Sequence, residues 1–178
     1  MKKEKPFLTV FTSTYNRSKT LPRLFESLCR QTDKNFEWLI VDDGSIDNTE
    51  EIVQPWLAED KGFPVRYIKK PNEGFHTGYN TAIANMESVL AVCIDSDDYM
   101  PDNAVALIHD CWVSRGSEAY GGIIGLDYRI DGTLIGGLLP EKVEAINLIA
   151  LAQGKYPVKP GDKKIVARTD LYKSVAPM

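Results

Sequence analysis

The alternation of apolar, β-rich runs with segments of helical periodicity is the feature that most constrains the fold of this chain. Residues 7–12, 36–41, 65–68 and 89–94 are typical of strands, and a segment typical of a helix lies between each run and the next. The run 89–94 is apolar at every position, which is typical of a central strand covered on both faces. This alternation predicts an α/β fold with a largely parallel sheet.

The positions of the other elements follow from the same patterns. A first helix is expected over residues 19–31. A second is expected to begin at Asp47, with Glu50 as its capping-box partner, and to be kinked or shortened by Pro55. Further helices are expected at 78–86, 103–113 and 142–152, and further strands at 122–128, through Ile135 and at 164–168. No packed element is expected after the last strand.

Length, charge and cysteine content exclude several classes of protein. A chain of 178 residues is expected to form one domain. Its 21 Lys and Arg against 25 Asp and Glu give a net charge of −4, which removes the driving force for general nucleic-acid binding. Cys29, Cys93 and Cys111 lie in no metal-binding or disulfide spacing, so we expect reduced thiols. No apolar run approaches the roughly 20 residues of a spanning helix, and we expect a cytoplasmic protein, with any membrane contact peripheral at the inner face.

Carboxylates are concentrated where two of the expected strands end. Asp42 and Asp43 close the second strand, and Asp95, Asp97 and Asp98 close the fourth. In open α/β sheets ligands bind at this edge, and so many carboxylates need a cation or several donors to offset their repulsion. An Asp-x-Asp segment suits Mg²⁺ or Mn²⁺ bound together with a diphosphate. The alternative is that these residues only cap turns and the next helix, or are solvated.

Two further segments contain polar groups that suit a nucleotide. Residues 12–17 place short hydroxyls and Tyr15 at the end of the first strand, where they could bond to a base or stack on it. A serine- and threonine-rich turn is the alternative. Residues 72–80 place Gly74 and Gly78 around a helix start, where backbone N–H groups can approach a phosphate or sugar. This segment is neither a Walker A loop nor a G-x-G-x-x-G motif.

Together and in this order, these segments resemble the inverting glycosyltransferases of family 2, which have the GT-A fold. The resemblance covers about residues 7–113, and the matching segments are 12–17, 41–49, 72–74 with Asn80, and 94–102. It implies a Rossmann-like three-layer α/β/α sandwich with a mostly parallel central sheet. It also implies transfer of a sugar from a nucleotide sugar, with UDP-sugars favoured, to a saccharide or lipid-linked acceptor. The transfer would be inverting and assisted by Mg²⁺ or Mn²⁺.

The resemblance also implies the roles of individual residues. Ser13 and Tyr15 would lie against the base, and Asp42 would accept a hydrogen bond from its imide N–H. Asp97 would be the metal ligand that bridges to the diphosphate, while Asp95 would face the ribose or support the metal. The full set expected at the nucleotide-sugar site is Thr12, Ser13, Tyr15, Asp42, Asp43, Gly74, His76, Asp95, Ser96 and Asp97. His76 is expected either as a hydrogen-bonded surface residue or as a contact to a phosphate oxygen.

The chain departs from the family pattern in three ways. Tyr79 stands where many members have an Arg, so a contact from that Arg to the diphosphate is not carried over. The Pro that commonly lies near Ser13 is absent. An inverting transfer also needs a general base, and no downstream carboxylate lies in the expected acidic motif. Our hypothesis is that residues 1–178 form one domain, with a donor-binding core over about 7–128, and that 129–178 begin an acceptor-side region whose base lies beyond Met178.

Three other functions are possible on sequence alone. A nucleotide-sugar-binding module without turnover would share every donor-side residue. A receiver-like phosphorylation domain also has acids at strand ends, but it would place paired acids after the first strand, where this chain has none. A glycosidase would need two carboxylates and no divalent cation.

Overall fold

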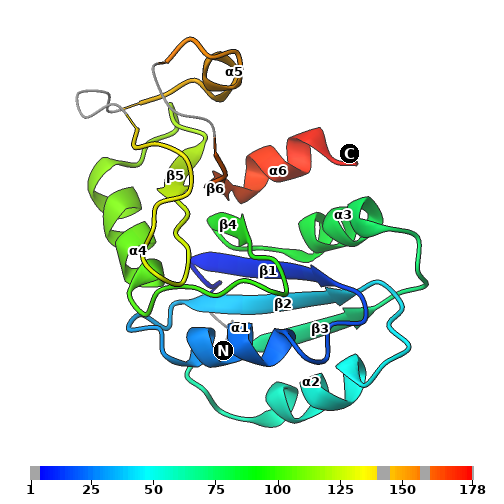
Figure 1. Cartoon of the computed structure of the whole chain (residues 1–178). Coiled ribbons are helices and arrows are strands. Elements are labelled where there is room, and N and C mark those ends of the chain that lie inside the picture. The colour runs from blue at the N-terminus through cyan, green and yellow to red at the C-terminus, as the bar shows by residue number, and fades with distance from the viewer. Residues whose placement is uncertain (1–4, 140–144, 157–160, 178) are drawn as a thin grey trace.

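The computed structural model describes residues 5–139, 145–156 and 161–177. Its centre is a six-stranded sheet with the strand order β3-β2-β1-β4-β6-β5 (Figure 1). Strands β1 to β4 are parallel, whereas β6 runs antiparallel to both β4 and β5. The strands are β1 (Leu8–Thr14), β2 (Phe36–Asp42), β3 (Val65–Lys69), β4 (Leu90–Cys93), β5 (Gly122–Leu126) and β6 (Lys163–Arg168).

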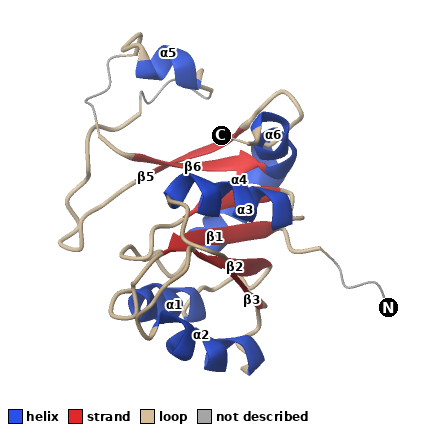
Figure 2. Cartoon of the chain, turned by 90° about the vertical axis from the view of Figure 1, so that its right-hand side faces the viewer, coloured by secondary structure: helices blue, strands red, loops and turns tan. Residues whose placement is uncertain are grey.

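Helices cover both faces of this sheet, which confirms the three-layer α/β/α arrangement (Figure 2). One face packs against α1, α2 and α4, and the other packs against α3 and α6. The helices are α1 (Leu21–Cys29), α2 (Thr49–Ala58), α3 (Phe75–Asn85), α4 (Ala104–Arg115), α5 (Leu148–Ala152) and α6 (Thr169–Val175).

The alternation of side chains along β1 shows how the sequence builds the two halves of the core. Leu8 and Val10 face the α1 side, whereas Phe11 faces the α3 side, as the twofold period of a strand requires. All three side chains are fully buried. The central position of β4, between β1 and β6, is likewise as the sequence predicted.

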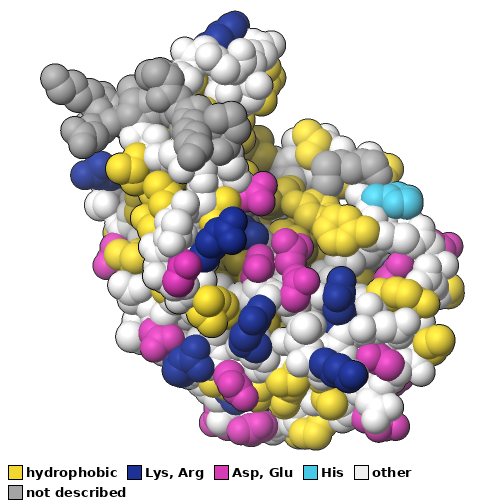
Figure 3. Space-filling view, viewed as in Figure 1, with side chains coloured by type: hydrophobic (Ala, Val, Ile, Leu, Met, Phe, Trp, Pro, Cys, Tyr) yellow, Lys and Arg dark blue, Asp and Glu magenta, His cyan; other side chains and the backbone are white. Residues whose placement is uncertain are grey.

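The sheet register places one edge of the molecule in position for a ligand. β1 pairs with β2 from Leu8 opposite Phe36 to Thr14 opposite Asp42, so both strands end together. Because β6 is antiparallel to β4, the beginning of β6 reaches the same edge at which β4 ends. Figure 3 shows acidic side chains gathered near the middle of one face, with basic side chains beside them.

The structure corrects several expected elements near the N-terminal half. β1 continues two residues beyond Thr12, which places Ser13 inside the strand. The expected capping box is wrong, since Asn48 is the N-cap residue of α2 and makes no side-chain cap bond. Glu50 instead lies 2.6 Å from Lys69 Nζ. α2 contains Pro55 and still continues to Ala58.

The C-terminal part also differs from the expectation. The helix expected over residues 142–152 is limited to Leu148–Ala152, with 142–144 outside the described residues. The return strand expected through Ile135 is reduced to one bridge between Tyr128 and Leu134. The expectation that nothing packs after the last strand is wrong, because Tyr172 of α6 makes edge-on ring contacts with Phe11 and Tyr79.

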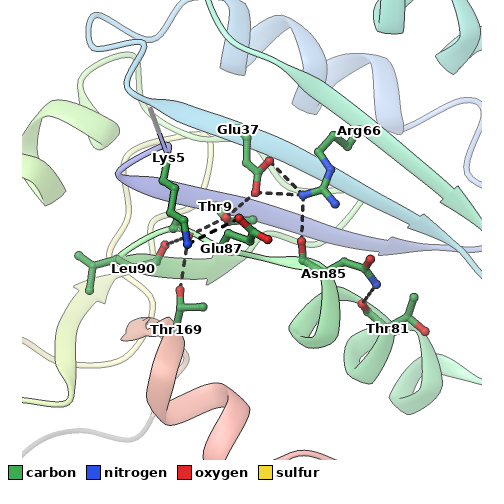
Figure 4. A network of polar contacts seen from close by, with 10 residues as sticks. Lys5, Thr9, Glu37, Arg66, Thr81, Asn85, Glu87, Leu90 and Thr169 are labelled. Carbon is green, nitrogen blue, oxygen red and sulfur yellow. Dashed lines mark hydrogen bonds and ion pairs between the residues drawn. The ribbon is translucent and has the colours of Figure 1, made fainter. Parts of the chain in front are cut away.

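A polar network lies near the starts of the central strands, at the end opposite the acidic edge (Figure 4). Glu37 of β2 accepts a hydrogen bond of 2.8 Å from Thr9 Oγ1 and lies 3.2 Å from Arg66 Nη1. Arg66 Nη1 also donates to the carbonyl oxygen of Asn85 at 2.9 Å. The Glu37 side chain is only 6% exposed, so its charge depends on these partners.

We expect Glu37→Gln to lower the free energy of unfolding by about 1–2 kcal/mol, because Thr9 and Arg66 would lose the charged acceptor of their hydrogen bonds. The matched control is Glu87→Gln, since the pair of Glu87 with Lys5 spans 3.6 Å and both side chains are exposed. This control should leave the stability unchanged. Urea unfolding of both variants measures the difference, and equal losses would contradict the assigned role of Glu37.

Candidate functional site

The loops that follow β1 and β2 are joined through Asn16. Its side-chain oxygen accepts hydrogen bonds from the backbone N–H groups of Ile46 at 2.9 Å and Asp47 at 3.3 Å. Its own N–H donates to Ser45 Oγ at 2.9 Å. Asn16 has a φ of 53°, a left-handed conformation that asparagine tolerates better than most residues. The two loops therefore form one unit at the strand ends.

Asp47 adds a second connection between these loops. Its carboxylate accepts hydrogen bonds from the N–H of Ser18 at 3.1 Å and from the N–H of Thr49 at 3.0 Å. Burial raises the pKa of Asp47, but the bonds from Thr49 and Ser18 outweigh it and lower the pKa to about 2. The carboxylate is thus held in its charged form.

Asp42, at the end of β2, is completely buried and its carboxylate is bound from two sides. One oxygen accepts the N–H of Ser45 at 2.7 Å, and the other accepts the hydroxyl of Tyr67 from β3. Burial and the bond to Asp42 both raise the pKa of Tyr67, so the phenol keeps its proton and donates it to this bond. The buried carboxylate of Asp42 therefore holds the loop after β2 in its conformation through the bond to Ser45.

Asp43 organises the loop between β3 and α3. It accepts hydrogen bonds from Lys70 Nζ at 2.7 Å and from the N–H groups of Glu73 at 3.1 Å and Gly74 at 2.8 Å. Lys70 Nζ also donates to Thr77 Oγ1 at 2.9 Å. Burial raises the pKa of Asp43, and these donors more than offset it, so the pKa is lowered. The N–H groups expected to approach a phosphate are therefore already bound to Asp43.

Gly74, the N-cap residue of α3, and Gly78, inside α3, each have a different structural reason for being glycine. Gly74 has a φ of 99°, which side chains of other residues rarely allow. Gly78 packs directly on β1, and a Cβ atom there would lie 2.3 Å from Ser13 Oγ. Gly78 thereby lets Ser13 sit between β1 and α3 at the site edge.

The loop after β4 presents three carboxylates to solvent. Asp95, Asp97 and Asp98 are exposed, whereas Ser96 between them is buried. Burial of part of its side chain raises the pKa of Asp95; Lys164 opposes this, while Asp98 and Asp97 add to it. The net shift of the Asp95 pKa is upward, chiefly because of burial, with the neighbouring carboxylates adding to it.

The structure divides the ten residues predicted for the site into two groups. Those with exposed or partly exposed surface are Ser13, Tyr15, Gly74, His76, Asp95 and Asp97. Those that are buried are Thr12, Asp42, Asp43 and Ser96. Thr12, for example, donates to the carbonyl oxygen of Ile94 and accepts from Trp38 Nε1. In this structure the buried side chains bond to neighbouring protein groups, and the direct contacts expected from them to a nucleotide sugar, including the bond from Asp42 to a base, stay a prediction.

The exposed carboxylates of Asp95 and Asp97 fit a hard divalent cation. Within the described residues, no three side chains of His, Cys, Asp or Glu are grouped so that they could hold a metal ion by themselves. Mg²⁺ is commonly bound through one or two carboxylates plus substrate phosphates, with water completing the shell. Two neighbouring carboxylates at an open strand end satisfy that requirement.

Three residues important to this edge carried no clear signal in the sequence. Tyr67 and Lys70 contact Asp42 and Asp43 only because β3 pairs with β2. Lys164 lies 3.5 Å from Asp98, through the antiparallel return of β6. Only one general argument from the sequence pointed to such a residue: crowded carboxylates need a cation near them.

A separate cavity of about 930 Å³ lies away from these carboxylates. It is lined mainly by apolar groups of α4, β5, β6 and the segment around α5, including Trp112, Ile123 and Leu148. None of the predicted site residues lines it. The chemistry of the strand ends, and not the size of this cavity, therefore defines the candidate site.

The comparison with family models agrees with this geometry. The model described as Glycosyl transferase family 2 matches residues 9–111, more than half of the chain, and the chain belongs to this family. This membership removes the receiver-like alternative.

Curated relatives share the same region. Chondroitin synthase from Escherichia coli is 35% identical over 108 residues, which cover 61% of this chain and 16% of the synthase. An uncharacterized glycosyltransferase, the MG025 homolog of Mycoplasma pneumoniae, is 33% identical over 119 residues, or 62% of this chain and 39% of that protein. The chain thus spans well under two thirds of the length of these relatives.

Solved structures show the fold. TarS 1-349 of S. aureus in complex with UDP matches with a TM-score of 0.68 at 22% identity, over 94% of this chain and 48% of that chain. The mannosyltransferase PcManGT from Pyrobaculum calidifontis, in complex with GDP-Man and Mn²⁺, matches with a TM-score of 0.68 at 18% identity, over 97% and 47%. The expected GT-A fold is therefore confirmed.

In the described part of the chain, no helix is long and apolar enough to cross a membrane.

We expect Gly78→Ala to destabilise the protein by about 1–3 kcal/mol, because its Cβ would collide with Ser13. The same exchange in an unobstructed helix interior would stabilise by about 0.5–1 kcal/mol. The double variant Ser13→Ala/Gly78→Ala removes the colliding oxygen and should recover part of the loss. Thermal unfolding measures both, and a G78A variant as stable as wild type would contradict the close packing.

We expect Asp47→Ala to lower the free energy of unfolding by about 1 kcal/mol near neutral pH, because the N–H groups of Ser18 and Thr49 lose their acceptor. The folded pKa of about 2 lies below the ordinary aspartate value of 3.8, so this stabilisation is present above that ordinary value and is lost as the pH falls through about 2. Urea unfolding from about pH 6 to about pH 2 should show the two proteins converging. A constant difference would exclude the carboxylate charge as its cause.

Proposed function

We propose that this chain is the nucleotide-sugar-binding part of an inverting, metal-assisted glycosyltransferase of the hexosyltransferase type. The observation that carries the proposal is the convergence of three segments at one edge of the sheet. These are the end of β1 with Ser13 and Tyr15, the start of α3 at Gly74, and the loop after β4 with Asp95 and Asp97. A base, a sugar and a diphosphate are the groups that such an edge can bind together.

In this proposal each exposed residue contacts a different part of the nucleotide-sugar donor. The Tyr15 ring is 44% exposed and is available to stack on a base, with Ser13 beside it. Gly74 has no side chain, which leaves room for the sugar or the diphosphate. His76 is exposed close to Gly74 and is available to a phosphate oxygen. The buried Asp42 and Asp43 hold these groups in place.

Asp97 and Asp95 would hold Mg²⁺ or Mn²⁺, which would neutralise the charge of the leaving diphosphate. UDP-sugars remain the favoured donors, since UDP and UDP-GlcNAc complexes of TarS are among the similar structures. GDP-Man in PcManGT is the competing choice. The chondroitin and hyaluronan synthases among the relatives support a saccharide acceptor, and a lipid-linked acceptor with peripheral membrane contact is the other form of this proposal.

Calorimetric titration of UDP, with and without Mn²⁺, tests this proposal. We expect binding that depends on Mn²⁺ and that weakens at least tenfold in Asp97→Ala, because the diphosphate loses its bridging cation. Asp110→Ala is the matched control, since this carboxylate lies on the solvent side of α4 and should leave the affinity unchanged.

Binding that ignores both Mn²⁺ and Asp97 would refute the assigned site. Hydrolysis of UDP-sugars then separates an enzyme from a module that only binds the donor.

A further inference from the structure

Lys164 of β6 is a cation directed at the acidic loop that follows β4. Val92 of β4 pairs with Val166 in the antiparallel register, so Lys164 lies level with the point where β4 ends. Its Nζ atom is 3.5 Å from Asp98 Oδ2 and 3.9 Å from Asp95 Oδ2. The Lys164 side chain is 26% exposed, about half the exposure of either carboxylate.

The carboxylates around Lys164 come from two different segments of the chain. Asp95 and Asp98 belong to the loop after β4, and Asp127 follows β5, the strand on the other side of β6. Burial lowers the pKa of Lys164, but Asp127, Asp95 and Asp98 outweigh this and raise it. The lysine therefore remains an ammonium group among several carboxylates.

The position of this ammonium group affects any second cation. A divalent ion bound by Asp95 and Asp97 would be repelled by Lys164, because both are positively charged and Lys164 already lies beside Asp95. A diphosphate brings additional negative charge that attracts both cations. Lys164 therefore weakens the binding of the metal ion alone. When the metal ion arrives with the nucleotide, the attraction of Lys164 for the diphosphate favours binding.

We infer that Lys164 is a tethered counter-cation that makes metal binding at the acidic loop depend on the nucleotide diphosphate. The lysine keeps Asp95 and Asp98 charge-compensated before any ligand arrives, and it contributes to diphosphate binding afterwards. This inference rests on the proposed function, because it assigns a role at the same site. Lys164 is a positioning residue for the ligands and takes no part in proton transfer.

Titration of Mn²⁺ alone, and of UDP in the presence of Mn²⁺, tests this role in wild type and Lys164→Met. We expect Mn²⁺ alone to bind about fivefold more tightly to K164M, because the competing charge is gone, and UDP with Mn²⁺ to bind about tenfold more weakly. Lys164→Arg keeps the charge and should resemble wild type in both titrations.

Lys163→Met is the matched control, because it removes the same charge from the adjacent residue of β6. Lys163 Nζ donates to the carbonyl oxygens of Ile135 and Asp162 and makes no ion pair with the loop after β4 in the described residues. We expect K163M to stay within about twofold of wild type in both titrations. Thermal unfolding verifies that the variants fold, and Lys164→Gln replaces K164M if the latter does not.

Failure of this inference differs from failure of the proposed function. Wild-type protein that does not bind UDP with Mn²⁺ would overturn the proposed function. Wild-type binding together with unchanged Mn²⁺ and UDP affinities in the uncharged Lys164 variant would overturn only the role of Lys164. Equal effects of K163M and K164M would also overturn it, since they would indicate a general change of charge.

Discussion

The burial of two consecutive carboxylates, Asp42 and Asp43, is the constraint on which the ligand-binding edge depends. A buried carboxylate is costly unless several donors bind it, and each of these two is bound by more than one donor. Asp42 is bound by Ser45 and by Tyr67 of β3, while Asp43 is bound by Lys70 and the N–H groups at the start of α3. The loops can satisfy both acids only in the conformations that present the site.

The fold and the outline of the site could be predicted because their signals are local. Apolar runs and helical spacing determine where strands and helices lie, and the resemblance carried by the four ordered segments implies the GT-A fold. The carboxylates of Asp95 and Asp97 lie at an exposed strand end, as their position after an apolar run implied. The inner position of β4 followed from its lack of polar residues.

The rest of the site depends on contacts between distant segments. β1 is longer than its sequence pattern indicated, and its alternation turns Thr12 toward Trp38 and Ile94 and leaves Ser13 against α3. Asp47 binds the N–H of Ser18 in the preceding loop, a contact that no capping-box pattern contains. The packing of α6 escaped prediction because it depends on Tyr172 meeting side chains of β1 and α3.

The pairing of β6 with β4 has a further consequence for the folding of this chain. β4 is a short, largely buried apolar strand, and β6 covers the side of it that β1 does not. Until β6 docks, the backbone N–H and C=O groups along that side of β4 have no strand partner and form an edge suited to pairing with another molecule. Contacts between such distant segments form late. The pairing of β6 with β4 thus removes an open strand edge from the centre of the sheet.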